Sequence, residues 1–407
     1  MYVASTRTPG SSVRVLKGVP GTVFALGTVS LLTDVSAEMV TAFLPVYLLY
    51  TLQLGYVQFG LLDGLYTGAT AVLRLVGGFV ADRVGRPKLV AFFGYAMSAV
   101  TKLVFPAVGS SAAAIGGVLA VDRAGKGART APRDALISLV TPQDQLGSAF
   151  GVHRAMDTVG AFCGPLLTTL ILWQLGTDPG PVFVVSFCFA AIGLVVLAAF
   201  VREHKSPPAR TKKVSLRAGL NLLRDKPFRL TTIAAAVLGL VTISDAFIFV
   251  VLQKVSGIPV NLLPLLPLGT AAVFLLGAAP IGKLSDRIGR WKVFFAGHML
   301  LLVAYITLLV PHGGYAAAAV ALVAHGSFYA CTDGVLMAYA GGFVPAELRA
   351  TGMATVQTGQ ALARMASSIV FGVMLAGMAM ATAVAVLAGV MVAALVGVAF
   401  LMPGRRA

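Results

Sequence analysis

Charged residues are scarce in this sequence: they make up 11% of its 407 residues, whereas a soluble domain has about 25%. Cysteine is scarce too, and its three copies lie in apolar segments without the spacing of a redox or metal motif. No cluster of His, Cys and Asp has the spacing of metal ligands. A phosphate loop of the form G-x-x-x-x-G-K-[ST] is also missing. The sequence therefore predicts neither a metal nor another cofactor, and it excludes an ATP-driven pump.

Hydrophobic residues, by contrast, make up 58% of the chain, and the mean hydropathy is +0.89. Such a composition predicts an integral membrane protein, and the length fits about twelve helical spans of ~20 residues each. The net charge of +16 comes from basic residues in alternate loops, which is typical of cytoplasmic loops rather than of a nucleic-acid-binding surface. We expect a lipid bilayer and no nucleic acid as partner. We also expect both termini in the cytoplasm, a plasma (bacterial inner) membrane location and a functional monomer.

The order of apolar and polar segments predicts two six-helix halves. A polar tail, 1–22, precedes the first half, 23–201, and a basic linker, 202–229, leads into the second half, 230–402, before a short tail, 403–407. The seventh span is expected to run unbroken over 230–253. Pro132 is expected to end or kink the fourth span, because proline removes a helix hydrogen bond.

A loop motif occurs once in each half, at positions 204 residues apart. Internal repeats of this kind are typical of transporters built from two halves around a central site. The pattern G-x-x-A/S-D-R-x-G-R-x-K resembles the signature of the major facilitator superfamily, which implies twelve transmembrane helices and alternating access. The motif positions are Gly78, Asp82, Arg83, Gly85 and Arg86, and then Asp286, Arg287, Gly289 and Arg290.

The resemblance implies that this loop is a cytoplasmic gate. Asp82 would face the N-terminal end of the eleventh span, where the helix dipole favours an anion. Arg83 and Arg86 would pair with an acid near the end of the fourth span, for which Asp134 is the candidate. The alternative is that both loops only anchor the chain on the positive side of the membrane.

Two further motifs resemble those of the superfamily. In the fifth span, Gly151, Gly160, Gly164 and Pro165 are similar to the glycine-rich motif of its antiporters, although Thr168 and Thr169 stand where paired glycines are usual. The alternative for these glycines is ordinary helix packing. In the fourth span, Arg123 followed by Lys126 resembles a motif that the family links to proton transfer.

Acidic residues in the first half are candidates for proton coupling. Asp34 and Glu38 are four residues apart and so share one helix face. The alternative is static neutralisation by Lys102 or by the cations of the fourth span. Asp122 and Lys126 also have the spacing of a favourable pair on one helix. The predicted proton-coupling residues are Asp34, Glu38, Arg123 and Asp157.

The second half has fewer internal ions, so we expect it to supply substrate contacts. The leading hypothesis is a carrier, not an enzyme, that exports a small organic molecule in exchange for protons by alternating access. Proton-coupled uptake or exchange of an anionic metabolite is the alternative, and a non-transporting receptor is a third possibility. The predicted substrate-cavity residues are Lys126, Arg154, Asp245, Tyr329, Asp333, Gln357 and Gln360.

Overall fold

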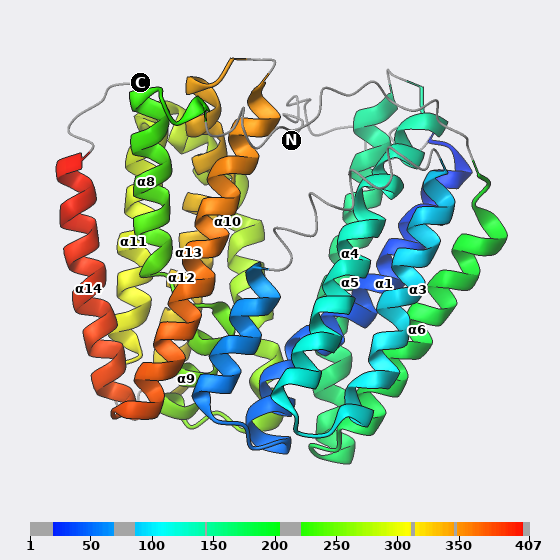
Figure 1. Cartoon of the computed structure of the whole chain (residues 1–407), viewed down its shortest axis with the longest axis horizontal. Helices are drawn as coiled ribbons and strands as arrows, with labels where there is room; N and C mark the ends of the chain where they lie inside the picture. The colour runs from blue at the N-terminus through cyan, green and yellow to red at the C-terminus, as the bar shows by residue number, and fades with distance from the viewer. Residues whose placement is uncertain are drawn as a thin grey trace. The chain divides into compact units, whose positions relative to one another are not determined.

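The computed structural model describes residues 19–68, 86–142, 145–203, 221–310, 314–345 and 348–401, and helices make up nearly all of these ranges (Figure 1). Within them no strand occurs. The earlier helices are α1 (Gly21–Val46) with η1 (Tyr47–Thr51), residues 56–68, α3 (Pro87–Val104) with η2 (Phe105–Val108), α4 (Ala112–Val140), α5 (Leu146–Leu175) and α6 (Pro179–Phe200). The later helices are α8 (Lys226–Leu240), α9 (Asp245–Ser256), η4 (Val260–Leu265), α10 (Leu266–Ile288), α11 (Arg290–Thr307), α12 (Gly314–Ala340), η5 (Gly341–Phe343), α13 (Arg349–Gly377) and α14 (Met380–Leu401).

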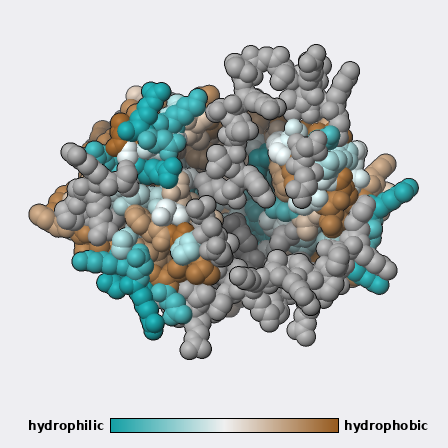
Figure 2. All heavy atoms as spheres, turned by 90° about the horizontal axis from the view of Figure 1, so that it is seen from above, coloured by the Kyte–Doolittle hydropathy of each residue, from teal (hydrophilic) through white to brown (hydrophobic). Residues whose placement is uncertain are grey.

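Nine helical segments in the described ranges are long and apolar enough to cross a membrane. Helix α4 is not among them, because charged residues interrupt its apolar sequence. Figure 2 looks onto one end of the helices. Hydrophilic residues gather there, as expected where a membrane protein meets water, and hydrophobic residues lie among and beside them. The prediction of an all-helical membrane fold is thus confirmed, while the number of twelve spans stays a prediction.

The described residues fall into two compact units. Unit 1 is drawn from residues 1–47 and 72–211, and unit 2 from residues 48–71 and 212–407. The helix formed by residues 56–68 therefore belongs to unit 2, although the sequence on both sides of it belongs to unit 1.

Unit 1 is organised around α1, which contacts both α5 and α6 extensively. Most of α1 is buried. The Ser36 and Ser186 hydroxyl groups are 2.9 Å apart and join α1 to α6, and Thr168 of α5 donates a 3.1 Å hydrogen bond to the Met39 carbonyl. A polar residue placed along α1 is consequently enclosed by protein on two sides.

Helices α3 and α4 approach closely through two glycines. A Cβ atom at Gly94 would lie 2.8 Å from the Gly125 carbonyl oxygen, and one at Gly125 would lie 2.6 Å from the Gly94 carbonyl oxygen. Helix α4 then continues through Pro132 to Val140. Pro132 therefore does not end the helix, and the residues on both sides of it share one helix, while a kink at this proline stays a prediction.

The predicted seventh span is not continuous, because the segment between Val241 and Ser244 separates α8 from α9. Helix α9 starts after Ser244, whose hydroxyl accepts a hydrogen bond from the Phe247 amide. The Tyr305 hydroxyl donates to the Val241 carbonyl at 3.0 Å and accepts from the Ile243 amide at 3.0 Å. One side chain thus satisfies backbone groups that the break removes from the helix ladder, as the membrane interior requires.

Candidate functional site

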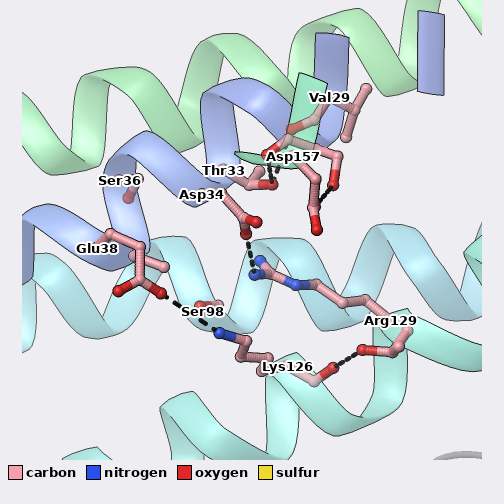
Figure 3. Close-up of polar contacts among 12 residues, drawn as sticks. Val29, Thr33, Asp34, Ser36, Glu38, Ser98, Lys126, Arg129 and Asp157 are labelled. Atoms are coloured by element: carbon pink, nitrogen blue, oxygen red, sulfur yellow. Dashed lines mark hydrogen bonds and ion pairs between the residues drawn. The ribbon is translucent and has the colours of Figure 1, made fainter. Parts of the chain in front are cut away.

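Two carboxylates of α1 meet two cations of α4 inside unit 1 (Figure 3). Asp34 lies 3.8 Å from the Arg129 guanidinium, and Glu38 lies 3.7 Å from the Lys126 ammonium. The Arg129 guanidinium also lies over the Tyr95 ring, 4.6 Å from its centroid. Only 5% of the Arg129 side chain and 17% of the Asp34 side chain are exposed, so this pair is largely removed from solvent.

A third carboxylate reaches the same place from α5. The Asp157 side chain interacts directly with that of Asp34. It also accepts a 2.5 Å hydrogen bond from the Ser30 hydroxyl and lies 3.9 Å from the Arg133 guanidinium. Arg133 in turn donates to Ser30 at 3.2 Å. Two acids and the cations of α4 therefore form one connected network across three helices.

A separate buried triad joins α3 to α4. Asp122 accepts from the Lys102 ammonium at 2.6 Å and from the Arg123 guanidinium, and also from Ser98 at 2.7 Å. All three charged residues are almost fully buried. The predicted pairing of Asp122 with Lys126 is therefore wrong, since the close approach of α3 brings Lys102 to Asp122 and leaves Lys126 to Glu38.

The remaining charged candidates of α5 lie toward its N-terminal part. Arg154 donates a 3.1 Å hydrogen bond to Asp157, and 73% of the Arg154 side chain is exposed. His153 is buried, and neither of its ring nitrogens has a hydrogen-bond partner among the described residues.

Most of the first gate motif, Gly78 to Gly85, lies outside the described residues. Arg86 is described, and it directly precedes α3. The acid expected to pair with this motif, Asp134, accepts hydrogen bonds from Arg133, its neighbour on α4, at 3.0 and 3.1 Å, and its pairing with Arg83 stays a prediction because Arg83 lies outside the described residues.

The second gate motif forms the turn between α10 and α11. Gly289 adopts φ +105°, a conformation that side chains with a Cβ rarely take. Asp286 and Arg290 pair across the turn at 2.9 Å, and Arg290 also donates to the Ala338 carbonyl of α12 at 3.0 Å. Arg287 is exposed. The second loop thus ties three helices of unit 2 together.

The glycines of the fifth-span motif differ in their surroundings. A Cβ atom at Gly160 would collide with the Leu31 carbonyl oxygen of α1, and one at Gly164 would lie 2.8 Å from the Val35 carbonyl oxygen. A Cβ atom at Gly151 would meet no atom within 4 Å. Pro165 lies inside α5, which continues past it. Two of the three glycines therefore permit the close approach that places Asp157 beside α1.

We expect Gly160→Ala to destabilise unit 1 by about 1–3 kcal/mol, because the added methyl group meets backbone that has to shift. The matched control is Gly151→Ala, where space is open and alanine is the better helix former. Thermal unfolding of the purified variants measures both. A Gly160→Ala protein as stable as Gly151→Ala would contradict the close-packing role.

Unit 2 contains its own polar cluster, in which the broken helix meets α12 and α13. Tyr329 donates to the Asp245 carboxylate, 2.7 Å from Oδ1, and Arg364 donates to Asp245 at 3.2 Å and to the Tyr329 hydroxyl at 2.6 Å. His325 lies 3.4 Å from Asp245 and 3.1 Å from the Thr270 hydroxyl. The Asp245 side chain is 43% exposed, so it is accessible although it is paired.

The other predicted substrate contacts of unit 2 lie on α12 and α13, and Asp333 is close enough to Arg364 of this cluster for their charges to interact. Asp333 lies one turn beyond Tyr329 on α12 and is exposed, as is Gln357 of α13, while Gln360 is half-buried. The site residues predicted from the sequence did not include Arg129, Arg133 and Arg364. For the first two a signal was present, since Lys126, Arg129 and Arg133 recur every three to four residues and so share one face of α4.

No group of three His, Cys, Asp or Glu side chains in the described ranges is arranged to hold a metal ion. The site is instead made of charged and hydroxyl side chains that project from apolar helices. Polar groups of this kind in membrane helices mark the pathways of substrates and ions. Together the fold and the site define a polytopic membrane protein of the carrier class.

The model of the Major Facilitator Superfamily matches residues 26–368. An uncharacterised MFS-type transporter of Methanocaldococcus jannaschii is 30% identical over 367 residues, which cover 86% of this chain and 87% of that one. The multidrug resistance protein MdtG of Citrobacter koseri is 25% identical over 300 residues, 69% of each chain. The chain belongs to the Major Facilitator Superfamily of membrane transporters.

Solved structures of other transporters share this fold. The nucleoside transporter NupG superposes with a TM-score of 0.82 at 14% identity, and the match covers 95% of this chain and all of that one. The peptide transporter PepTSo gives a TM-score of 0.76 at 12% identity. These similarities concern the fold, so the substrate has to be inferred from the site.

Proposed function

We propose that this transporter moves a small organic molecule across the plasma (bacterial inner) membrane in exchange for protons, and that export is its physiological direction. The observation that carries the proposal is the position of Asp34 between a cation, Arg129, and a second carboxyl group, Asp157. Two carboxyl groups in contact are most stable with one proton between them, because two adjacent negative charges repel. A proton site is thereby built into the contact of α1, α4 and α5.

Protonation of Asp34 would change its bonds. As a carboxylate, Asp34 attracts Arg129, which stabilises the contact of α1 with α4. As a neutral acid it can donate a hydrogen bond to Asp157, and its attraction to Arg129 is lost. Because the exposed fraction of Asp34 is small, the Coulomb energy that changes is larger than it would be in water. Proton binding would therefore alter the relative stability of two conformations, as alternating access requires.

Export is supported by two observations. Gly160 and Gly164 of the motif that resembles those of antiporters approach α1 closely, and MdtG, a relative over 69% of the chain, is named for multidrug resistance. The alternative, uptake or exchange of an anionic metabolite, is favoured by the exposed Arg154 and the partly exposed Lys126. Arg123 fits that role poorly, since Asp122 already holds its guanidinium.

Purified protein in lipid vesicles tests the proposal. The vesicles have an acidic interior and contain a pH-sensitive dye, and a panel of drugs, nucleosides, peptides and organic acids is added outside. For an antiporter, a transported compound enters as protons leave, so we expect the interior pH to rise in its presence and not in protein-free vesicles. A fall of the interior pH on addition would instead identify a symporter. Substrate movement without any change in pH would contradict proton coupling.

A further inference from the structure

A half-buried acid lies in unit 2, away from the network that contains Asp34. Asp63 projects from the helix of residues 56–68, and its Oδ2 atom is buried without a hydrogen-bond partner among the described residues. The Ser368 hydroxyl oxygen of α13 is likewise buried and unpartnered. Ser368 and Ser244 both lie within interaction distance of the Asp63 carboxyl group. Buried polar atoms without partners are rare in proteins and call for an explanation.

The helix of residues 56–68 packs closely against its neighbours. A Cβ atom at Gly60 would lie 2.7 Å from the Ser368 carbonyl oxygen, and one at Gly64 would lie 3.0 Å from the Met365 carbonyl oxygen. The Phe59 ring packs against the Phe247 ring of α9, with centroids 4.8 Å apart. The helix that carries Asp63 is therefore packed closely against α9 and α13.

The charged groups that face Asp63 do not neutralise it. They are Asp245 of α9 and Arg364 of α13, which carry opposite charges. Arg364 is already bonded to Asp245 and to Tyr329, and Asp63 forms no ion pair within the described part of the chain. An ionised carboxylate buried without its own cation costs several kcal/mol, so such groups tend to take up a proton.

We infer that Asp63 is a second proton-binding site, located at the break between α8 and α9. A proton on its carboxyl group removes the negative charge that no nearby cation compensates, and it adds a second donor beside the Ser368 hydroxyl group. Ser244 connects the site to the break, because its hydroxyl caps the first turn of α9. Each unit of the transporter then contains one acid that can exchange a proton.

Infrared spectroscopy of the purified full-length protein in lipid tests this inference without any substrate. Protonated carboxyl groups give a C=O stretching band distinct from that of carboxylates. At neutral pH we expect Asp63→Asn to remove one component of this band and Asp34→Asn to remove a different one. The control Asp286→Asn, whose side chain is 61% exposed, should leave the band unchanged. Loss of the Asp34 component tests only the proposed function, whereas loss of the Asp63 component tests the second proton-binding site.

Ser368→Ala provides a second variant that retains Asp63 and makes only a small change in the core. We expect it to shift the Asp63 component in frequency, because the acid loses a neighbouring hydroxyl group. Spectra in sodium chloride and in choline chloride should be identical. An unchanged band in Asp63→Asn would overturn the inference, and so would an Asp63 component that disappears only in sodium, since the site would then bind Na⁺ in place of a proton.

Discussion

Asp34→Asn is expected to abolish accumulation of substrate driven by a pH gradient, so that the internal and external concentrations become equal. Asparagine keeps the size of the side chain and accepts a hydrogen bond from Arg129, but it cannot bind and release a proton. Asp157 keeps its donors Ser30 and Arg154 and loses the second carboxyl group with which to share a proton. Exchange of labelled for unlabelled substrate needs no net proton movement. It should stay within about threefold of wild type, a change of less than 1 kcal/mol in the barrier.

The measurement uses a labelled compound found in the vesicle assay, with uptake followed first under a pH gradient and then under exchange conditions. Thr28→Val is the matched control on the same helix, because within the described residues the Thr28 hydroxyl bonds only to the Phe24 carbonyl one turn earlier. This control should behave as wild type in both assays. If Asp34→Asn still concentrates substrate against its gradient, Asp34 is not the coupling acid.

The largest loss of stability is expected for Asp122→Asn. This substitution leaves two buried cations, Lys102 and Arg123, without their shared anion. Removing one partner of a buried ion pair costs about 3–5 kcal/mol, and here one change affects two pairs. We expect a sharply lower unfolding temperature and little monodisperse protein on size-exclusion chromatography.

Lys102→Met is the informative companion variant. It removes one cation and leaves Asp122 bonded to Arg123, so the buried charges of the triad become balanced. We therefore expect Lys102→Met to unfold at a higher temperature than Asp122→Asn. The reverse order would mean that Asp122 is not the centre of the triad.

The sequence predicted the helical membrane fold well, because long apolar segments have few other stable structures. As an alternative to proton coupling it also left open that Asp34 and Glu38 are neutralised by Lys102 or by the fourth span, and the structure pairs them with Arg129 and Lys126. This pairing depends on the close approach of α3 to α4 at Gly94, because that approach places Lys102 beside Asp122. Pairing across helices depends on packing distances, and residue spacing within one helix does not contain them.

The break between α8 and α9 was missed for a related reason. The segment around Thr242 is as apolar as a continuous span, and the residue that stabilises the break, Tyr305, is more than sixty positions later in the chain. Asp63 was visible as an acid inside an apolar segment. Its lack of a counter-ion, however, depends on Arg364 being bonded to Asp245, which only the fold reveals.

Residues 48–71 cluster with unit 2, while the chain before and after them belongs to unit 1. The polypeptide thus passes from one unit to the other three times, and the basic segment between residues 203 and 221 is only the last of these passages. If the gene were divided within that segment, the first fragment would contain residues 56–68 but not α13. The glycine-lined face of residues 56–68 would then have no helix to cover it. The second fragment would lack residues 48–71, so unit 2 would be complete only where both fragments are produced together.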